Sequence, residues 1–285
     1  MIGLAAIRRH WFATRHAYSR AVVVGVIVMI LLILTACLAN LLYPGDPLDM
    51  VGRPSLWPGI NPRFPLGTDS LGRDMAAEIC HGARVSLLIG FSAAAISVVL
   101  GVLVGLFAGY LGGIADAALM RLTELFQTMP AFLFAIVLVV ILGPSIGSII
   151  LAIGITAWPQ VARLVRVEAL RIRNTDYVHA SISMGIGHVR IIATHVLPNS
   201  LTPVIVAASV LVANAILVEA SLSFLGLGDP GVVSWGSMIG VGRSVLRTAW
   251  YMAALPGVAV FVTVLAFTLI GTGLSDMLNP REAVR

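Results

Sequence analysis

Long stretches without a charged residue are the feature of this sequence that most constrains its fold. Residues 21–45, 85–115 and 125–162 contain no Asp, Glu, Lys or Arg. A helix needs about 20 mainly apolar residues to cross a bilayer, so each stretch is long enough to span a membrane. Only 11% of the chain is charged and 59% is hydrophobic, whereas soluble domains are roughly a quarter charged. The sequence therefore predicts a membrane protein with several spans.

The stretch 125–162 is too long for one crossing, because about 38 residues of helix would measure roughly 57 Å, nearly twice the thickness of the hydrocarbon layer. Its middle reads Gly143-Pro144-Ser145-Ile146-Gly147, a strong turn signal that divides it in two. We therefore predict an all-α fold with six transmembrane helices, at 21–43, 85–111, 128–143, 148–167, 201–221 and 251–274.

The arginines predict how these spans are oriented. The chain has 18 cationic residues, and all of them are arginine. If the N-terminus lies inside, twelve arginines fall on the cytoplasmic side and six outside, as the positive-inside rule favours. We therefore predict that both termini are cytoplasmic. The cytoplasmic segments would be 1–20, 112–127, 168–199 and 275–285, and the external ones 44–84 and 222–250.

Several classes of function conflict with the composition. Without lysine the chain has no phosphate-binding P-loop and no Schiff-base chemistry. The net charge of +5 is scattered between apolar runs and makes no basic stripe, so a nucleic-acid partner is not expected. Cys37, Cys80 and the six histidines lack metal-ligand spacing, and we predict no metal site. A chain of proton-relay residues within the spans is also missing, so any energy for transport should come from another chain.

Two motifs have the form of catalytic or nucleotide-binding sequences. Residues 143–147 match G-x-S-x-G, but they join two membrane helices, where a nucleophile elbow would need a preceding strand. Residues 226–231 match G-x-G-x-x-G, also without a strand before them. We interpret both as turns. An intramembrane hydrolase using Ser145, or a standalone channel or ion-coupled carrier, is the less favoured alternative class.

Small residues recur every four positions in the second predicted span. Ala93, Ser97, Gly101, Gly105 and Gly109 would form a strip along one helix face. Such a strip lets a neighbouring membrane helix approach closely.

The segment 168–199 predicts two short cytoplasmic helices. Asp176 is placed to cap the first, and Gly185-Ile186-Gly187 supplies a turn. The second would run over residues 188–195 and be stopped by Pro198.

One side of the first of these helices is predicted to carry Tyr177, Ala180 and Met184. Periodicity alone leaves two interpretations equal: docking into a groove of a partner protein, or a loop that lies on the membrane surface.

The residues of this segment also resemble a known sequence motif. Tyr177-Val178-His179-Ala180-Ser181, Met184-Gly185 and His195-Val196-Leu197-Pro198-Asn199 resemble the EAA loop of binding-protein-dependent ABC importer permeases. The chain is most similar in pattern to the second permease subunit of dipeptide, oligopeptide and nickel importers. The resemblance covers about residues 21–281, with a permease core over 85–281, and includes residues 66–74, 82–87, 108–113, 219–228, 234–236 and 278–281.

Some positions depart from the family's pattern. His179 stands where the family usually has glutamate, and Ser181 where it has a second alanine. Asp176, one helical turn before, could partly replace the missing charge. In the C-terminal part, Thr272 and Ser275 stand where aspartate and arginine are more common.

The resemblance implies a type I ABC importer permease in the bacterial inner membrane, working by alternating access. Its implied partners are a homologous second permease, two cytoplasmic ATP-binding subunits or one fused pair, and an external solute-binding protein. ATP and Mg²⁺ would be bound by the ATP-binding subunits, and this chain would hold no cofactor. The implied cargo is a short peptide, with a nickel chelate or another small solute as the alternative.

The resemblance also implies roles for individual residues. An outer gate or pathway role is implied for Glu219 and Phe224, although capping near the following loop is an equal alternative for Glu219. In the outer segments, Arg73 and Asp74 could instead pair with each other. Contacts with the binding protein are implied for Trp57, Arg73, Asp74 and Trp235, and coupling to the ATPases for Asp176, Tyr177, His179, Ala180, Ser181, Met184, Gly185 and Pro198.

Overall fold

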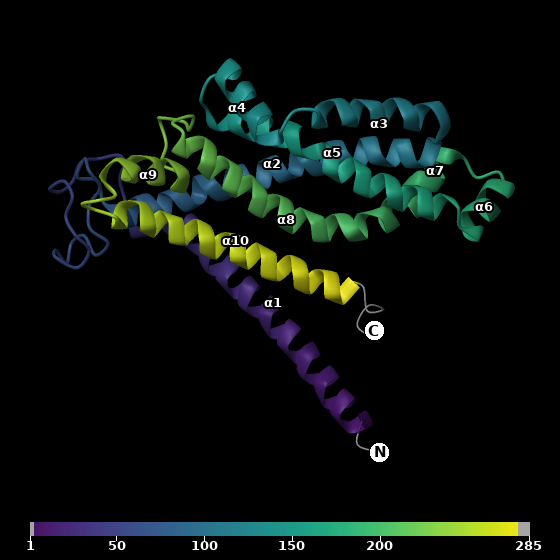
Figure 1. The fold of residues 1–285 in the computed structure, drawn as a ribbon, viewed down its shortest axis with the longest axis horizontal. Helices are drawn as coiled ribbons and strands as arrows, with labels where there is room; N and C mark the ends of the chain where they lie inside the picture. Colours follow the sequence, from purple (N-terminus) through teal and green to yellow (C-terminus); the bar gives the residue numbers. More distant parts are fainter. Residues whose placement is uncertain (1–2, 279–285) are drawn as a thin grey trace.

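Long helices lie side by side in the structure, a computed structural model that describes the backbone of residues 3–278 and the side chains of residues 21–277. The loop between the first two helices lies at one end of the molecule, and the short helices α6 and α7 lie at the other (Figure 1). The elements are α1 (Gly3–Leu42), α2 (Met75–Leu111), α3 (Gly113–Gln127), α4 (Ala131–Leu142), α5 (Ile146–Arg173), α6 (Asp176–Ser183), α7 (His188–Ile191), a π-helical turn (Ile192–Val196), α8 (Leu197–Phe224), α9 (Trp235–Gly242), a 3₁₀ turn (Arg243–Val245) and α10 (Tyr251–Leu278).

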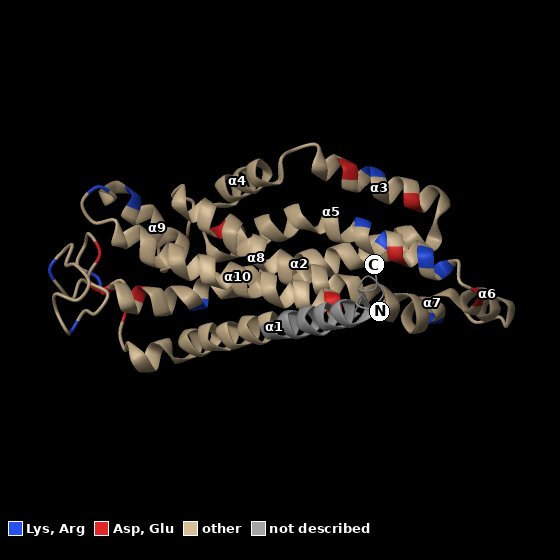
Figure 2. Cartoon of the chain, turned by 60° about the horizontal axis from the view of Figure 1, so that its bottom comes forward, with Lys and Arg blue, Asp and Glu red and all other residues tan. Residues whose placement is uncertain are grey.

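The predicted all-α membrane fold is confirmed. Five helices in the described part of the chain are long and apolar enough to cross a bilayer, and a sixth crossing exists if α3 and α4 together form one bent span. Charged residues gather toward the two ends of the bundle and leave its middle almost free of charge (Figure 2). Large apolar side chains such as Ile141 and Phe261 are exposed on the outside of the bundle, as expected of helices that face lipid.

The predicted span over 128–143 does not form one membrane-length helix. Helix α4 has only 12 residues, about 18 Å of helix, which is too short to cross the hydrocarbon layer alone. The preceding segment 112–127, predicted to be a loop, contains the 15-residue helix α3. The two helices meet at an angle of 79°. Pro130 lies at the N-cap of α4, where its missing N–H interrupts a continuous helix.

Most other helices extend beyond the predicted spans. Helix α2 begins at Met75 instead of residue 85, because the Asp74 carboxylate accepts the N–H of Ala76 and caps the helix further upstream. Apolar length marks where a helix crosses lipid, whereas caps decide where it begins. The 37 residues of α2 make about 55 Å of helix, more than the hydrocarbon layer needs. Its charge-free stretch begins at residue 85, after Glu78 and Arg84, so the first turns are the part expected to project beyond this layer.

Three other segments also differ from the predicted boundaries. Helix α1 begins at Gly3, within the segment 1–20 that was predicted to precede the first span. The segment 222–250 contains α9. Most of the predicted tail, with the motif at 278–281, lies outside the described residues.

Helices α2 and α5 pack together along the strip of small residues. A Cβ added at Gly109 would lie 2.6 Å from the carbonyl oxygen of Arg166, and one added at Gly101 would lie 2.7 Å from Cγ1 of Val161. A Cβ at Gly105 would collide with the carbonyl oxygen of Ala162. The two backbones therefore approach so closely that a side chain at these glycines has no room.

Candidate functional site

The short helix α6 is anchored on one face and free on the other. Val178 and Ser181 are buried against the bundle, while Tyr177 and Met184 are exposed, with 46% and 71% of their surface accessible. The hydroxyl of Ser181 donates to the carbonyl oxygen of Tyr177 at 2.8 Å. Among the residues assigned to ATPase coupling, Ser181 therefore lies inside, and the exposed members are Asp176, Tyr177, His179, Ala180, Met184, Gly185 and Pro198.

The exposed surface of this segment carries four large apolar side chains among polar and charged ones. Beside Tyr177 and Met184 it includes Ile182, with 41% of its surface accessible, and Val189 of α7, with 82%. These four residues are called the coupling face below. Because α6 and α7 lie at an end of the bundle and not along its sides (Figure 1), an apolar surface there suggests a protein partner.

The predicted cap of α6 is corrected by the structure. Thr175 occupies the N-cap position, with its carbonyl oxygen accepting the N–H groups of Val178 and His179. Asp176 is the first residue of the helix, where its negative charge is favourable near the helix N-terminus. The sequence could not separate the two positions, because Thr and Asp are both strong N-cap residues.

Gly185 turns the chain after α6. Its φ angle is +78°, and a Cβ added there would meet nothing within 4 Å. The position needs glycine for its left-handed backbone, not for lack of space.

Pro198 does not stop a helix, contrary to the prediction. The chain passes from α7 through the π-helical turn into α8, and Pro198 lies in the first turn of α8. Proline is tolerated there because the first N–H groups of a helix need no partner within it. The side-chain amide of Asn199 donates to the carbonyl oxygen of His195 at 2.6 Å and so satisfies an acceptor close to the proline.

At the opposite end of the bundle, aromatic residues attach the long loop to the start of α10. The ring centroid of Trp57 lies 5.2 Å from that of Tyr251 and 6.3 Å from that of Trp250. The hydroxyl of Tyr251 lies 2.8 Å from the carbonyl oxygens of Leu56 and Thr68. Trp57 and Trp250 are both well exposed. The sequence analysis missed Trp250, although a Trp-Tyr pair at the start of a span is typical of a membrane interface.

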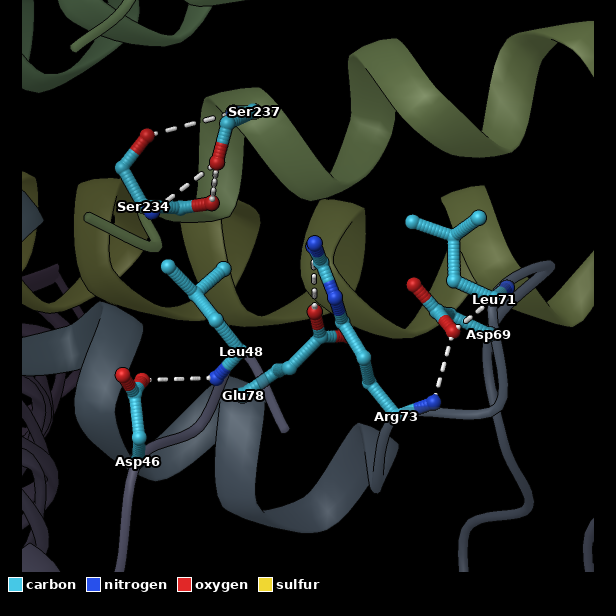
Figure 3. A network of polar contacts seen from close by, with 8 residues as sticks. All are labelled: Asp46, Leu48, Asp69, Leu71, Arg73, Glu78, Ser234 and Ser237. Atoms are coloured by element: carbon cyan, nitrogen blue, oxygen red, sulfur yellow. Dashed lines mark hydrogen bonds and ion pairs between the residues drawn. The ribbon is translucent and has the colours of Figure 1, made fainter. Parts of the chain in front are cut away.

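Arg73 and Asp74 do not pair with each other, so that interpretation is wrong. The Arg73 guanidinium faces Glu78, with Nη1 3.8 Å from Oε1 (Figure 3). Asp74 caps α2, and the carboxylate of Asp69 accepts the backbone N–H of Arg73 at 2.8 Å. Asp74 occupies the N-cap, so its carboxylate is oriented toward helix N–H groups and not toward its neighbour.

Glu78 lies in the first turn of α2, outside the predicted span 85–111, and its side chain is 5% exposed. Burial, and after it the charge of Asp69, raise the pKa of Glu78 from 4.5 to about 8, while Arg73 acts in the opposite direction. The folded protein thus holds this proton more tightly than the unfolded chain does. The stability that this provides is complete below the ordinary pKa of glutamate and is lost as the pH rises through about 8.

The expected consequence is that the melting temperature of the purified protein falls between pH 5 and pH 9. The free energy at stake is on the order of 4 kcal/mol. Glu78→Gln should flatten this dependence, and Glu124→Gln, at a site with a 60% exposed side chain, should leave it unchanged. An unaltered slope in Glu78→Gln would contradict the assignment. Differential scanning fluorimetry in detergent measures both variants.

Trp235 is fully buried, so its assignment as a contact for a binding protein is corrected. Its indole Nε1 donates to the carbonyl oxygen of Ile79 at 3.0 Å. This contact fixes the short helix α9 against α2. The backbone N–H of Trp235 also donates to the hydroxyl of Ser86 at 3.2 Å, and neither contact across the fold could be predicted from the sequence.

Glu219 is also fully buried. Its carboxylate accepts hydrogen bonds from the hydroxyls of Ser223, at 2.8 Å, and Ser86, at 3.3 Å. The contact with Ser86 joins α2 to α8. The pathway role of Glu219 stays a prediction.

Phe224, the other residue assigned to the pathway, lies at the edge of an open apolar groove with a volume of about 580 Å³. The guanidinium of Arg243 covers its ring at 5.1 Å. A pathway role for Phe224 likewise stays a prediction. The groove lies among α4, α8, α9 and α10, and its lining residues are Phe132, Leu217, Ala220, Ser221, Phe224, Leu225, Ile239, Gly257, Val260, Phe261 and Val264.

Ser145, the residue on which a hydrolase would depend, is the N-cap of α5. Its Oγ accepts the backbone N–H of Ser148 at 3.2 Å and lies 2.8 Å from the Ser148 hydroxyl. Capping accounts for this serine. Among the described residues, no group of three His, Cys, Asp or Glu is placed to hold a metal ion.

A bundle of membrane-length helices with a short helical segment at one end defines a multi-pass membrane protein. Residues 101–284 match the family model described as binding-protein-dependent transport system inner membrane component. The chain belongs to this family, and the resemblance to ABC importer permeases is confirmed. It is a multi-pass protein of the bacterial inner membrane.

Relatives similar over almost the whole chain have names from peptide transport. The di/tripeptide transport system permease protein DppC of Pseudomonas aeruginosa is 39% identical over 93% of this chain and 89% of its own length. The dipeptide permease protein DppC of Haemophilus influenzae is 35% identical, with coverage of 96% and 95%. The glutathione permease protein GsiD of Pectobacterium atrosepticum is 36% identical, with coverage of 97% and 93%.

Solved structures share the fold at low sequence identity. The MetNI methionine ABC transporter in inward-facing conformations aligns with a TM-score of 0.57 at 20% identity, covering 73% of this chain and 97% of that chain. An amino acid ABC transporter aligns with a TM-score of 0.52 at 17% identity, covering 72% and 92%. At these identities the likeness concerns the fold alone.

Proposed function

We propose that this chain forms half of the translocation pathway of an ATP-driven importer for short peptides and that it works by alternating access. It would pair with a homologous permease and with two ATP-binding subunits or one fused pair. An external solute-binding protein would deliver the peptide. ATP hydrolysis would take place on the ATP-binding subunits, because this chain has no lysine for a P-loop.

The coupling face is the single observation that carries this proposal. An apolar surface on a short helix whose opposite side is buried against the bundle suits docking into a groove of a partner protein. The same surface would favour the membrane interface if it lay along the lipid-facing flank. It lies instead at the end of the bundle opposite the long loop (Figure 1). In this proposal that end is cytoplasmic and the loop end is external.

The choice of short peptides as cargo rests on the relatives, three of which are named for di/tripeptides, dipeptides and glutathione. Glutathione is itself a tripeptide, so a common cargo class includes all three. The spans offer few ionisable groups for ion coupling (Figure 2), which supports an external source of energy.

An uptake experiment with the assembled complex tests this function. The chain, its partner permease, ATP-binding subunits and binding protein would be reconstituted in proteoliposomes with ATP inside. We expect labelled dipeptide and tripeptide to accumulate only when ATP and the binding protein are both present. Free amino acids and nickel salts serve as comparison cargoes. Uptake without ATP-binding subunits would contradict the importer function, and uptake of nickel alone would contradict the peptide cargo.

A further inference from the structure

Tyr110, the penultimate residue of α2, makes a contact that the coupling face does not explain. Its side chain is buried, with 4% of its surface accessible. Its hydroxyl lies 2.9 Å from Nδ1 of His188 in α7, a hydrogen bond in which either group can donate. The two rings meet edge to face, with centroids 5.8 Å apart. The end of α2 and the start of α7 are 78 residues apart in the sequence and are joined here by side chains.

A second contact holds the end of α2 from another direction. Nη1 of Arg173, the last residue of α5, donates to the carbonyl oxygen of Leu111 at 3.2 Å. Together with the glycine strip, this contact makes α2 and α5 one closely packed unit. Tyr110 extends that unit to α7.

The connection from α7 to α8 is of a different kind. The π-helical turn Ile192–Val196 lies between them. Such turns are rare, occur frequently at functional sites and are among the known causes of helix kinks. The hydrogen bond between Tyr110 and His188 therefore links the α6–α7 segment to α2. Toward α8 the same segment continues through the less regular π-helical turn.

We propose that Tyr110 is a positioning residue that makes α7 move together with α2 and α5 when the ATP-binding subunits displace α6, with the π-helical turn as the hinge toward α8. This inference rests on the proposed function and adds the route by which the movement enters the membrane. Without the Tyr110 hydroxyl, α6 and α7 would move while α2 and α5 stayed in place. ATP would then be hydrolysed without a matching movement of α2 and α5.

The test compares peptide uptake with ATP hydrolysis in the reconstituted complex. Tyr110→Phe removes the hydroxyl and keeps the ring, so folding and co-purification of the ATP-binding subunits should be retained. The number of peptides transported per ATP should fall roughly fivefold, as expected for the loss of one hydrogen bond. Tyr43→Phe is the matched control, because Tyr43 contacts the His81 imidazole through its backbone carbonyl oxygen, which this substitution leaves unchanged.

Variants of His188 distinguish the effect of its hydrogen bond with Tyr110 from a general effect on packing. His188→Ala should lower the ratio as Tyr110→Phe does, and the double variant should be no worse than either single one. His188→Asn retains hydrogen-bonding groups close to the position of Nδ1. It should therefore transport nearly as many peptides per ATP as the wild type.

Two results would overturn the inference: a normal ratio in Tyr110→Phe, or losses that simply add in the double variant. In both cases the wild-type complex would still couple uptake to ATP, so the proposed function would stand. A wild-type complex without ATP-dependent uptake would overturn both.

Discussion

Replacing Met184 and Val189 together by glutamate is expected to abolish ATP-driven uptake. Both side chains belong to the coupling face and are more than two thirds exposed in the isolated chain. Burying a side chain of this size contributes roughly 1.5–3 kcal/mol to an interface, and an unpaired charge in its place is costly to desolvate. Together the two changes should weaken binding of the ATP-binding subunits by more than about a hundredfold. Co-purification and uptake measure the two effects.

The control places one glutamate at the other end of the bundle. Leu246 is 50% exposed and lies in the segment 222–250, outside the predicted spans. Leu246→Glu should leave co-purification of the ATP-binding subunits unchanged. If the double variant retained both the subunits and uptake, the coupling face would not be the docking surface.

Gly105→Leu is expected to prevent α2 and α5 from packing. Even a Cβ at this position would collide with the backbone carbonyl oxygen of Ala162, an atom that cannot move without shifting α5. Overpacking in a well-packed core typically costs 1–3 kcal/mol per site, and a leucine adds three further carbons. We expect little folded protein in the membrane, as fluorescence-detection size-exclusion chromatography would measure, and no uptake.

Alanine variants at two glycines test the cause of this effect. Gly147 lies in the first turn of α5, and a Cβ there would meet nothing within 4 Å. Alanine is the better helix former by about 1 kcal/mol, so Gly147→Ala should be neutral or stabilising. Gly105→Ala should be destabilising despite the same helix propensity. Equal effects at both sites would show that close approach of the two backbones is not what requires glycine at residue 105.

The sequence predicts the number of apolar segments better than their ends. Uncharged length identified the crossing part of α2, but the cap at Asp74 that lengthens the helix depends on which of several acidic residues faces the helix N–H groups. The bend between α3 and α4 was missed because apolar residues follow Pro130 as they would in a straight span. Hydropathy measures the affinity of a segment for lipid and does not show whether its helix is straight or bent.

In the candidate sites too, local features could be predicted from the sequence, whereas contacts between distant residues could not. The segment with the two short helices α6 and α7 could be located from its residues and its turn, since Gly185 supplies a backbone conformation that few other residues adopt. The buried state of Trp235 and the pairing of Arg73 with Glu78 could not be predicted, because they depend on contacts across the fold. The contact of Tyr110 with His188 joins residues far apart in the sequence, and no local pattern predicts it.

The bend between α3 and α4 has a consequence for how the chain enters the bilayer. Backbone groups released by a break in a helix are tolerated at membrane depth only where protein covers them. Helix α4 packs on α5, and α3 packs on both α2 and α5, so part of this cover comes from a helix that is synthesised later. We therefore expect the segment 113–142 to settle into the membrane only after α5 has emerged from the ribosome. Truncation before residue 146 should leave it exposed to the quality-control proteases of the membrane.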